Sequence, residues 1–446
     1  MDEAANFKKN MSEKKGIRFA LRALGHRNYL LYFVGQGVSL TGTWMQRIAM
    51  QWLVYRLTGS ALLLGVVGFA SQIPIFVLSP LGGVMADRWD RHKVLVVTQT
   101  LAMLQAFAIA ILTLTGRIAE WHIIALGLFL GVVNAFDMPM RQAFIVEMVE
   151  GKEDLSNAIA LNSFIVNGAR LVGPSVAGIL IAALGEGLCF LLNAISFIAV
   201  IAALLAMRLK RREMKRRAGK VWQELKGGAA YAFGFAPIRS ILLLTALVAL
   251  VGMPYTVLMP VFAKDILHGG PSTLGLLMAA TGVGAIIGAG FLASRKNAAG
   301  LETVVAVAAG TFGMGLVLLA QSRTLWLALL LLVITGLGMM VQMASNNTVL
   351  QTIVDDDKRG RVMSFHNMAF MGVTPFGSLL GGALADRIGT PGTLMACGVA
   401  CALAALLFAS RLRKFRAQVR PVYERLGFVK QSADSADWQQ NTRRTP

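Results

Sequence analysis

Twelve apolar stretches, each long enough to cross a lipid bilayer as a helix, recur between Tyr29 and Ser410. A hydrocarbon layer of about 30 Å takes about 20 apolar residues per helical crossing. Lipid offers no hydrogen-bond partners to the backbone, so each crossing must be a helix. The sequence therefore predicts an all-α membrane protein with twelve transmembrane helices. The expected spans are 29–55, 60–86, 93–115, 121–149, 156–183, 188–207, 238–262, 273–293, 301–321, 325–353, 362–385 and 393–410.

The composition excludes a soluble domain. Of the 446 residues, 56% are hydrophobic and 15% are charged, and a single soluble core could not bury that much apolar surface. The three cysteines lie inside apolar runs, so we expect neither a disulfide framework nor a metal site. No phosphate-binding loop of the G-x-x-x-x-G-K-[ST] kind occurs, which excludes pumping by ATP. No enzyme constellation is found, so we expect neither catalysis nor a cofactor.

The net charge of +20 lies between the apolar stretches and at the chain ends, which excludes nucleic acid as a partner. With a cytoplasmic N-terminus, the segments on that side collect Arg88, Arg91, Lys93, Lys152, the run 208–226, Arg295, Lys296, Lys358, Arg359, Arg361 and the basic tail. The opposite loops keep Arg56, Arg117, Lys264, Arg323 and Arg387. Basic residues favour the cytoplasmic side of a membrane. We therefore expect a multi-pass protein with both termini in the cytoplasm.

A basic stretch that begins at Arg208 divides the chain into two similar sets of six spans. Gly173-Pro174 in the fifth span is matched by Thr374-Pro375 in the eleventh. A parallel duplication of this kind places a substrate site near the bilayer midplane, between two pseudo-symmetric six-helix bundles. The expected parts are an N-terminal cytoplasmic extension (1–28), a first bundle (29–207), a basic linker (208–237), a second bundle (238–410) and a basic cytoplasmic tail (411–446).

The short loop after the second span carries the sharpest motif, Gly83-Val-Met-Ala-Asp87-Arg88-Trp-Asp90-Arg91-His-Lys93. It resembles the major facilitator signature G-x-x-x-D-R-x-G-R-[RK], with Asp90 in place of the second glycine. The resemblance implies that Gly83 permits close helix approach and that Asp87, Arg88 and Arg91 latch the cytoplasmic side in the outward-open state. Charge-assisted hydrogen bonds of about 1.5–3 kcal/mol each suit a latch that must also open.

A second motif in the fifth span is Ala169-Arg-Leu-Val-Gly173-Pro174-Ser-Val-Ala177-Gly178. It resembles the antiporter signature of exporting facilitators, G-x-x-x-G-P-x-x-G-G, with two alanines in place of glycines. Pro174 frees a backbone carbonyl, and the small residues Gly173 and Gly178 allow tight packing, so we expect a helix bend here. The resemblance favours export.

Ionisable residues inside a membrane are costly, and each is a candidate for function. The first half holds nearly all of them, on three polar stripes at helical spacing: Gln36, Thr43 and Arg47; Asn134, Asp137 and Arg141; and Ser163, Asn167 and Arg170. Asp137 and Arg141 lie one turn apart and are expected to pair. Three arginines against one acid leave a cationic cavity, which attracts an anionic or catecholic substrate.

Two alternatives stay open for these charges. Asp137 could carry a coupling proton, or the whole set could be a static buried ion network. In the second half the candidates are neutral: Gln342 and Asn346 in the tenth span, and His366 at the start of the eleventh. His366 is a second candidate for the proton, although a lone histidine inside a membrane is more often only hydrogen-bonded. Glu147, near the cytoplasmic face, is expected to pair with Arg88 or Arg91.

Four further stretches resemble the enterobactin-exporter-like branch of the major facilitators: 42–47, 51–60, 137–142 and 359–364. The resemblance covers nearly the whole chain. It implies proton-driven efflux from the bacterial cytoplasm and a place in the cell inner membrane. Members of the branch resemble siderophore exporters and macrolide or multidrug pumps.

Three functions compete. The first is a secondary active transporter that exports a small amphipathic or anionic, siderophore-like molecule by alternating access, with the proton gradient as its energy source. The second is a broad-specificity drug or macrolide efflux pump, and the third is an importer or a non-transporting membrane receptor. The expected partners are a small-molecule substrate, membrane lipid and protons, and the expected state is a monomer.

Overall fold

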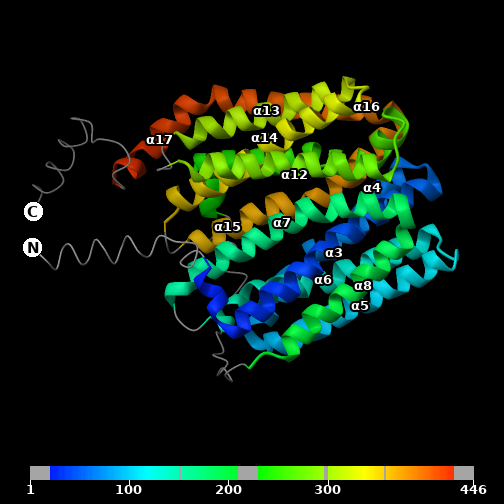
Figure 1. Cartoon of the computed structure of the whole chain (residues 1–446). Coiled ribbons are helices and arrows are strands. Elements are labelled where there is room, and N and C mark those ends of the chain that lie inside the picture. The colour runs from blue at the N-terminus through cyan, green and yellow to red at the C-terminus, as the bar shows by residue number, and fades with distance from the viewer. Residues whose placement is uncertain (1–20, 150–151, 209–229, 296–299, 356–357, 426–446) are drawn as a thin grey trace, which may run out of the picture. The chain divides into compact units, whose positions relative to one another are not determined.

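A computed structural model describes residues 21–149, 152–208, 230–295, 300–355 and 358–425, and every regular element in these ranges is a helix (Figure 1). The first half of the chain contributes η1 (Arg22–Gly25), α3 (Arg27–Thr58), α4 (Ala61–Arg88), α5 (Arg91–Leu114), α6 (Glu120–Met148), α7 (Lys152–Leu184) and α8 (Glu186–Leu205). The second half contributes α10 (Ala236–Leu247), η2 (Val248–Gly252), α11 (Tyr255–Val261), η3 (Phe262–Ile266), α12 (Pro271–Ala293), α13 (Leu301–Gln321), α14 (Leu325–Ile353), α15 (Arg359–Asn367), η4 (Met368–Gly372), α16 (Thr374–Ser410) and α17 (Leu412–Arg425).

Each predicted span coincides with described helix, which confirms the prediction of an all-helical membrane protein. Ten described segments are long and apolar enough to cross a membrane. One of them, Arg359–Ser410, accounts for two predicted spans, because Gly389 has a left-handed φ of 73° and breaks the helix inside α16. α3 is richer in polar residues and is not one of the ten, but its 32 residues are long enough to cross.

Polar caps set where several of these helices begin. Ser60 accepts a hydrogen bond from the Leu63 amide at the start of α4 (3.2 Å). Asp90 does the same for the Lys93 amide at the start of α5 (3.2 Å). Asp90 replaces a glycine of the family signature, yet its φ of −68° is open to any residue. The aspartate therefore fits the turn and satisfies an amide that the helix leaves unpaired.

The first compact unit consists of α3 to α8 together with the segment Thr256–Gly282. In it α4 packs against α6, α5 against α8, and α3 against both α7 and α8. Figure 1 shows α3, α5, α6 and α8 running alongside one another. The segment Thr256–Gly282 is joined to this bundle by a hydrogen bond from the Tyr55 hydroxyl to the Asp265 carboxylate. The same segment crosses α7 where Gly178 meets Gly275, and a Cβ on either glycine would lie within 2.9 Å of the other's Cα.

The second compact unit consists of residues 219–255 and 283–446, described here from 230 to 425 with its gaps. In it α13 packs against α14 and α16, which repeats the pairing of α5 with α6 and α8 in the first unit. The amphipathic helix α17 buries Phe415, Val419 and Tyr423, and Arg416 forms an ion pair with Glu302 of α13 (2.9 Å). The domain bounds expected from the sequence stay a prediction. Residues 1–20, 209–229 and 426–446 of the expected extension, linker and tail lie outside the described residues.

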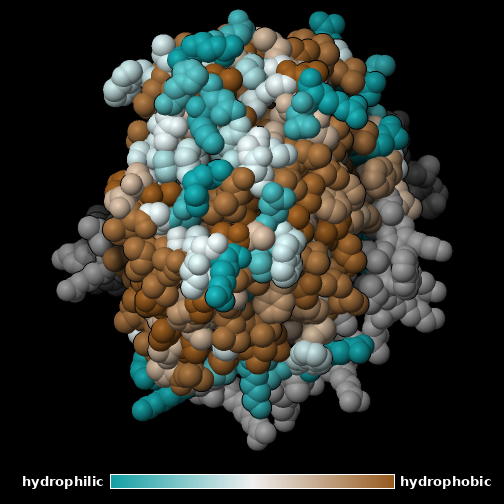
Figure 2. All heavy atoms as spheres, turned by 90° about the vertical axis from the view of Figure 1, so that its right-hand side faces the viewer, coloured by the Kyte–Doolittle hydropathy of each residue, from teal (hydrophilic) through white to brown (hydrophobic). Residues whose placement is uncertain are grey.

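Large apolar side chains are abundant on the surface, as lipid requires. Phe164 of α7 is 71% exposed and Trp326 of α14 is 83% exposed. Figure 2 shows broad areas of hydrophobic residues on the face it presents. The three cysteines, Cys189, Cys397 and Cys401, are buried instead and pack as small core residues.

Candidate functional site

Asp137 lies at the centre of a hydrogen-bonded cluster inside the first unit. It is 1% exposed. One carboxylate oxygen, Oδ1, accepts hydrogen bonds from Thr98 Oγ1 (2.8 Å) and Gln99 Nε2 (2.7 Å), both on α5. The other oxygen, Oδ2, forms the ion pair with Arg141 one turn further along α6. The pairing predicted for Asp137 and Arg141 is therefore confirmed, and helix α5 adds two donors that hold the carboxylate in place.

Arg47 and Arg170 converge on one aromatic ring. The Cζ atom of Arg47 lies 5.2 Å from the ring centroid of Trp44, and the Cζ atom of Arg170 lies 5.8 Å from the same centroid. Arg47 comes from α3 and is exposed, whereas Arg170 comes from α7 and is half-buried. Each arginine lies about three turns or more from either end of its helix. A charge at that depth is unfavourable in lipid and indicates a polar face of the unit.

The neutral residues of the three predicted stripes have mixed environments. Gln36 is buried, whereas Thr43 and Asn134 are half-buried. The Thr43 hydroxyl donates to the Ser39 carbonyl oxygen (2.9 Å). Asn167 is exposed and its Nδ2 donates to the Ser163 carbonyl oxygen (2.9 Å). Their part in a substrate cavity stays a prediction.

The predicted residues of the second unit are buried polar groups. Asn346 Nδ2 donates to Thr245 Oγ1 of α10 (3.0 Å). Among the described residues, no hydrogen-bond partner is found for Asn346 Oδ1, Gln342 Nε2 or His366 Nδ1. His366 is 3% exposed and lies near the end of α15, just before the π-helical turn η4. A proton role for His366 stays a prediction.

The motif after α4 forms a polar junction between α4, α5 and α6. Arg91 donates through Nε to the Ala86 carbonyl oxygen (2.8 Å) and through one terminal nitrogen to Glu147 of α6 (2.8 Å). The expected pairing of Glu147 is therefore found with Arg91, while Arg88 is exposed. The Asp87 side chain lies outside the described part of the structure. A gating role for these residues stays a prediction.

Glycines near both motifs mark where helices touch. A Cβ on Gly83 would meet no described atom within 4 Å, whereas a Cβ on the neighbouring Gly82 would overlap the Ala135 carbonyl oxygen of α6. Within this motif the close approach of α4 to α6 therefore falls on Gly82 and not on Gly83. On α7, Gly173 faces α3 and Gly178 faces α12, and the helix continues through Pro174. The predicted bend at Gly173, Pro174 and Gly178 stays a prediction.

Sequence reasoning missed several residues of this site. Thr98, Gln99 and Trp44 are partners of the predicted charges but lie on other turns or helices. A buried amide chain was also missed, in which Asn193 donates to Gln46 (2.7 Å) and Gln46 donates to Gln105 (2.9 Å). The sequence does show these polar residues inside apolar spans, which makes them candidate site residues. It does not show which residues they contact.

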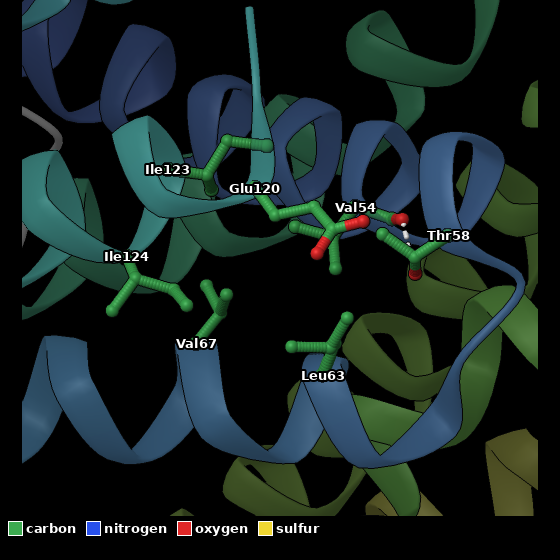
Figure 3. Close-up of a pocket in the computed structure, with 7 residues that line it drawn as sticks. All are labelled: Val54, Thr58, Leu63, Val67, Glu120, Ile123 and Ile124. Carbon is green, nitrogen blue, oxygen red and sulfur yellow. Dashed lines mark hydrogen bonds between the residues drawn. The ribbon is translucent and has the colours of Figure 1, made fainter.

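A narrow crevice lies elsewhere in the first unit, between α3, α4 and α6 (Figure 3). Its lining is mainly aliphatic, with the carboxylate of Glu120 reaching toward Thr58. Glu120 starts α6 and lies about 25 Å along that helix from Asp137. The crevice is too narrow for a substrate chamber and is separate from the cluster of charges.

Comparison with known proteins agrees with this architecture. A family model described as transmembrane secretion effector matches residues 20–431. The staphyloferrin A transporter of Staphylococcus aureus (strain NCTC 8325 / PS 47) is 26% identical over 388 residues, which cover 86% of this chain and 96% of that protein. The multidrug efflux pump Tap of Mycolicibacterium fortuitum is 26% identical over 398 residues, covering 87% of this chain and 95% of the pump.

Solved structures match the fold. The bacterial homologue of the human lysosomal transporter Spinster, in an inward-facing and occupied conformation, aligns with a TM-score of 0.68 at 15% identity. The alignment covers 88% of this chain and 98% of that structure. Because the family model covers residues 20–431, the chain is a membrane transporter and not an enzyme. It belongs to the transmembrane secretion effector family, a branch of the major facilitator superfamily.

Proposed function

We propose that this transporter exports a small amphipathic or anionic molecule, siderophore-like in its chemistry, by proton-coupled alternating access. The observation that carries the proposal is the set of four charges within the spans of the first unit. Asp137 and Arg141 neutralise each other, whereas Arg47 and Arg170 have no acidic partner among the described residues. A surplus of positive charge on a polar face attracts an anion.

The names of the relatives support export of small molecules. One relative is named for the transport of staphyloferrin A, and others are named as multidrug or macrolide efflux proteins. The family description, a secretion effector, agrees with movement out of the cell. The proposed location is the inner membrane of a bacterium, with both termini in the cytoplasm and one chain as the working unit.

Asp137 is the proposed carrier of the coupling proton. Its carboxylate is buried but adjoins Arg141, whose side chain is 22% exposed. A proton bound at Asp137 would remove the charge that holds Arg141, whereas the ionised carboxylate keeps the arginine in its ion pair. Export in exchange for protons would require that the protonated form of this pair binds the solute less tightly than the ionised form, so that proton and solute are carried in turn. The Arg91 and Glu147 pair at the end of α6 would serve the cytoplasmic latch.

A broad drug or macrolide pump is the second candidate. It is favoured by the relatives that are named for multidrug and macrolide efflux. The two candidates differ in the charge of the preferred substrate. The proposed exporter prefers a negatively charged molecule, whereas a broad pump would not require a negative charge on its substrate.

Transport by the purified protein in liposomes tests the proposal. Salicylate and erythromycin serve as anionic and macrolide probes, a pH gradient of either sign is imposed, and solute movement and internal pH are recorded. We expect solute to move against the direction of proton flow. Asp137→Asn should abolish gradient-driven movement, while Glu120→Gln, which changes an exposed carboxylate, should leave it unchanged. Movement that ignores the gradient, or full activity of Asp137→Asn, would remove proton coupling at Asp137.

A further inference from the structure

Helices α3 and α7 meet closely at the point where Arg47 and Arg170 both contact the Trp44 ring. Trp44 and Arg47 lie three residues apart on α3 and project from one side of it. Arg170 lies three residues before Gly173 on α7. A Cβ on Gly173 would lie 2.9 Å from the Thr41 carbonyl oxygen and would overlap the Trp44 side chain. The glycine therefore lets α7 approach α3 at this level, and the approach places Arg170 beside Trp44.

No described carboxylate supplies a counter-charge to the two guanidinium groups. Among the described residues, no carboxylate pairs with Arg47 or Arg170, and Asp137 already accepts hydrogen bonds from Thr98, Gln99 and Arg141. Each guanidinium gains only a weak cation–π contact with the indole ring. The indole ring carries no net charge, so it does not cancel the repulsion between two like charges beside it. The ring alone therefore does not balance two neighbouring cations within the membrane spans.

We propose that Trp44, Arg47 and Arg170 form a subsite that binds the oxyanion, a carboxylate or phenolate, of an aromatic solute. Planar guanidinium groups bind carboxylates through paired, charge-assisted hydrogen bonds. The indole ring gives the aromatic part of the solute an apolar surface on which to stack. The anion supplies the missing negative charge and relieves the repulsion between the two arginines. This inference rests on the proposed export function and names the substrate class that the first unit selects.

The subsite gives a role to Gly173, a small residue of the motif that resembles the antiporter signature. Gly173 acts as a positioning residue, because any larger side chain would push α7 away from Trp44 and separate Arg170 from Arg47. The motif thus contributes to substrate choice as well as to helix packing. Arg141 is distinct from the subsite, because its partner is Asp137 and not Trp44.

Binding to the purified full-length protein tests the subsite. The probes are salicylate and salicylamide, which share the aromatic ring and the hydroxyl but differ in charge. We expect the wild type to bind salicylate more tightly than salicylamide. Arg47→Gln and Arg170→Gln should each weaken salicylate binding by about 10- to 100-fold, the effect of losing one charge-assisted hydrogen bond. Neither substitution should change salicylamide binding.

Matched variants separate the subsite from general charge effects. Arg56→Gln removes an arginine that pairs with Glu186 near the end of α3, and it should leave salicylate binding unchanged. Arg47→Lys and Arg170→Lys keep the charge and should retain a weakened preference for salicylate. If a glutamine variant does not elute as a single species in size-exclusion chromatography, salicylate binding by the lysine variants tests the subsite instead. Equal binding of the two probes by the wild type, or unchanged salicylate affinity in the arginine variants, would overturn the subsite.

Transport measured on the same preparations distinguishes the two proposals. If the wild type moves no probe in liposomes while the binding results hold, the export function fails and the subsite stands. If the wild type moves erythromycin while salicylate binds equally to wild type and arginine variants, the subsite fails and the export function stands.

Discussion

Asp137 uses both of its carboxylate oxygens, and this explains how a charge is tolerated in the middle of a membrane-spanning helix. Thr98 and Gln99 satisfy one oxygen and Arg141 satisfies the other. Such a pair contributes little net stability, because desolvation offsets the attraction, but removal of one partner leaves an uncompensated charge. Among the described residues no carboxylate pairs with Arg47 or Arg170, and we propose that these two charges bind a ligand.

Removal of the Asp137 charge should destabilise the protein, because Arg141 loses its partner. Asp137→Ala is expected to lower the free energy of unfolding by about 3–5 kcal/mol, because Arg141 is then left unpaired. A second substitution, Arg141→Gln, should restore part of that loss. Chemical or thermal unfolding of the two variants in detergent would measure both effects. If the double variant is less stable than Asp137→Ala, and the further loss equals that of Arg141→Gln alone, the two side chains do not stabilise each other.

At the scale of elements, glycines decide which helices approach closely. α4 meets α6 at Gly82, α7 meets α3 at Gly173, and α7 meets α12 where Gly178 faces Gly275. Without a hydrophobic force between helices in lipid, van der Waals packing of this kind largely holds a bundle together. The Asp90 cap and the break at Gly389 then set where helices begin and end.

Substitutions at two adjacent glycines of α4 test this packing. Gly82→Val should destabilise the protein by about 1–3 kcal/mol, because its side chain would overlap the backbone of α6. Gly83→Ala should be nearly neutral for stability, since its Cβ meets no described atom. Thermal unfolding followed by intrinsic fluorescence would compare them. Equal melting temperatures for Gly82→Val and the wild type would show that the helices do not pack here.

At the scale of the whole molecule, basic residues and helix order predict the orientation in the membrane. The native cysteines are buried, so a single introduced cysteine can be labelled against a low background. Glu120 and Arg413 are both exposed, and the predicted topology places them on opposite sides of the membrane. They are therefore suitable positions for labelling from the two sides.

An impermeant maleimide should label Glu120→Cys in intact cells. It should label Arg413→Cys only after the membrane is opened, because positive charge favours the cytoplasmic side. The reverse pattern would contradict the predicted orientation. Denatured samples of each variant control for expression and for the reactivity of the cysteine.

The sequence by itself determined what depends on neighbours along the chain. Span lengths follow from the thickness of the bilayer, and the Asp137 pair with Arg141 follows from a spacing of one helical turn. The tertiary structure alone decided that Thr98 and Gln99 hold Asp137, that Arg47 and Arg170 both contact the Trp44 ring, and that the segment 256–282 packs with the first unit. Hydrophobicity and helical period are local properties, whereas these partners come together only when separate helices pack.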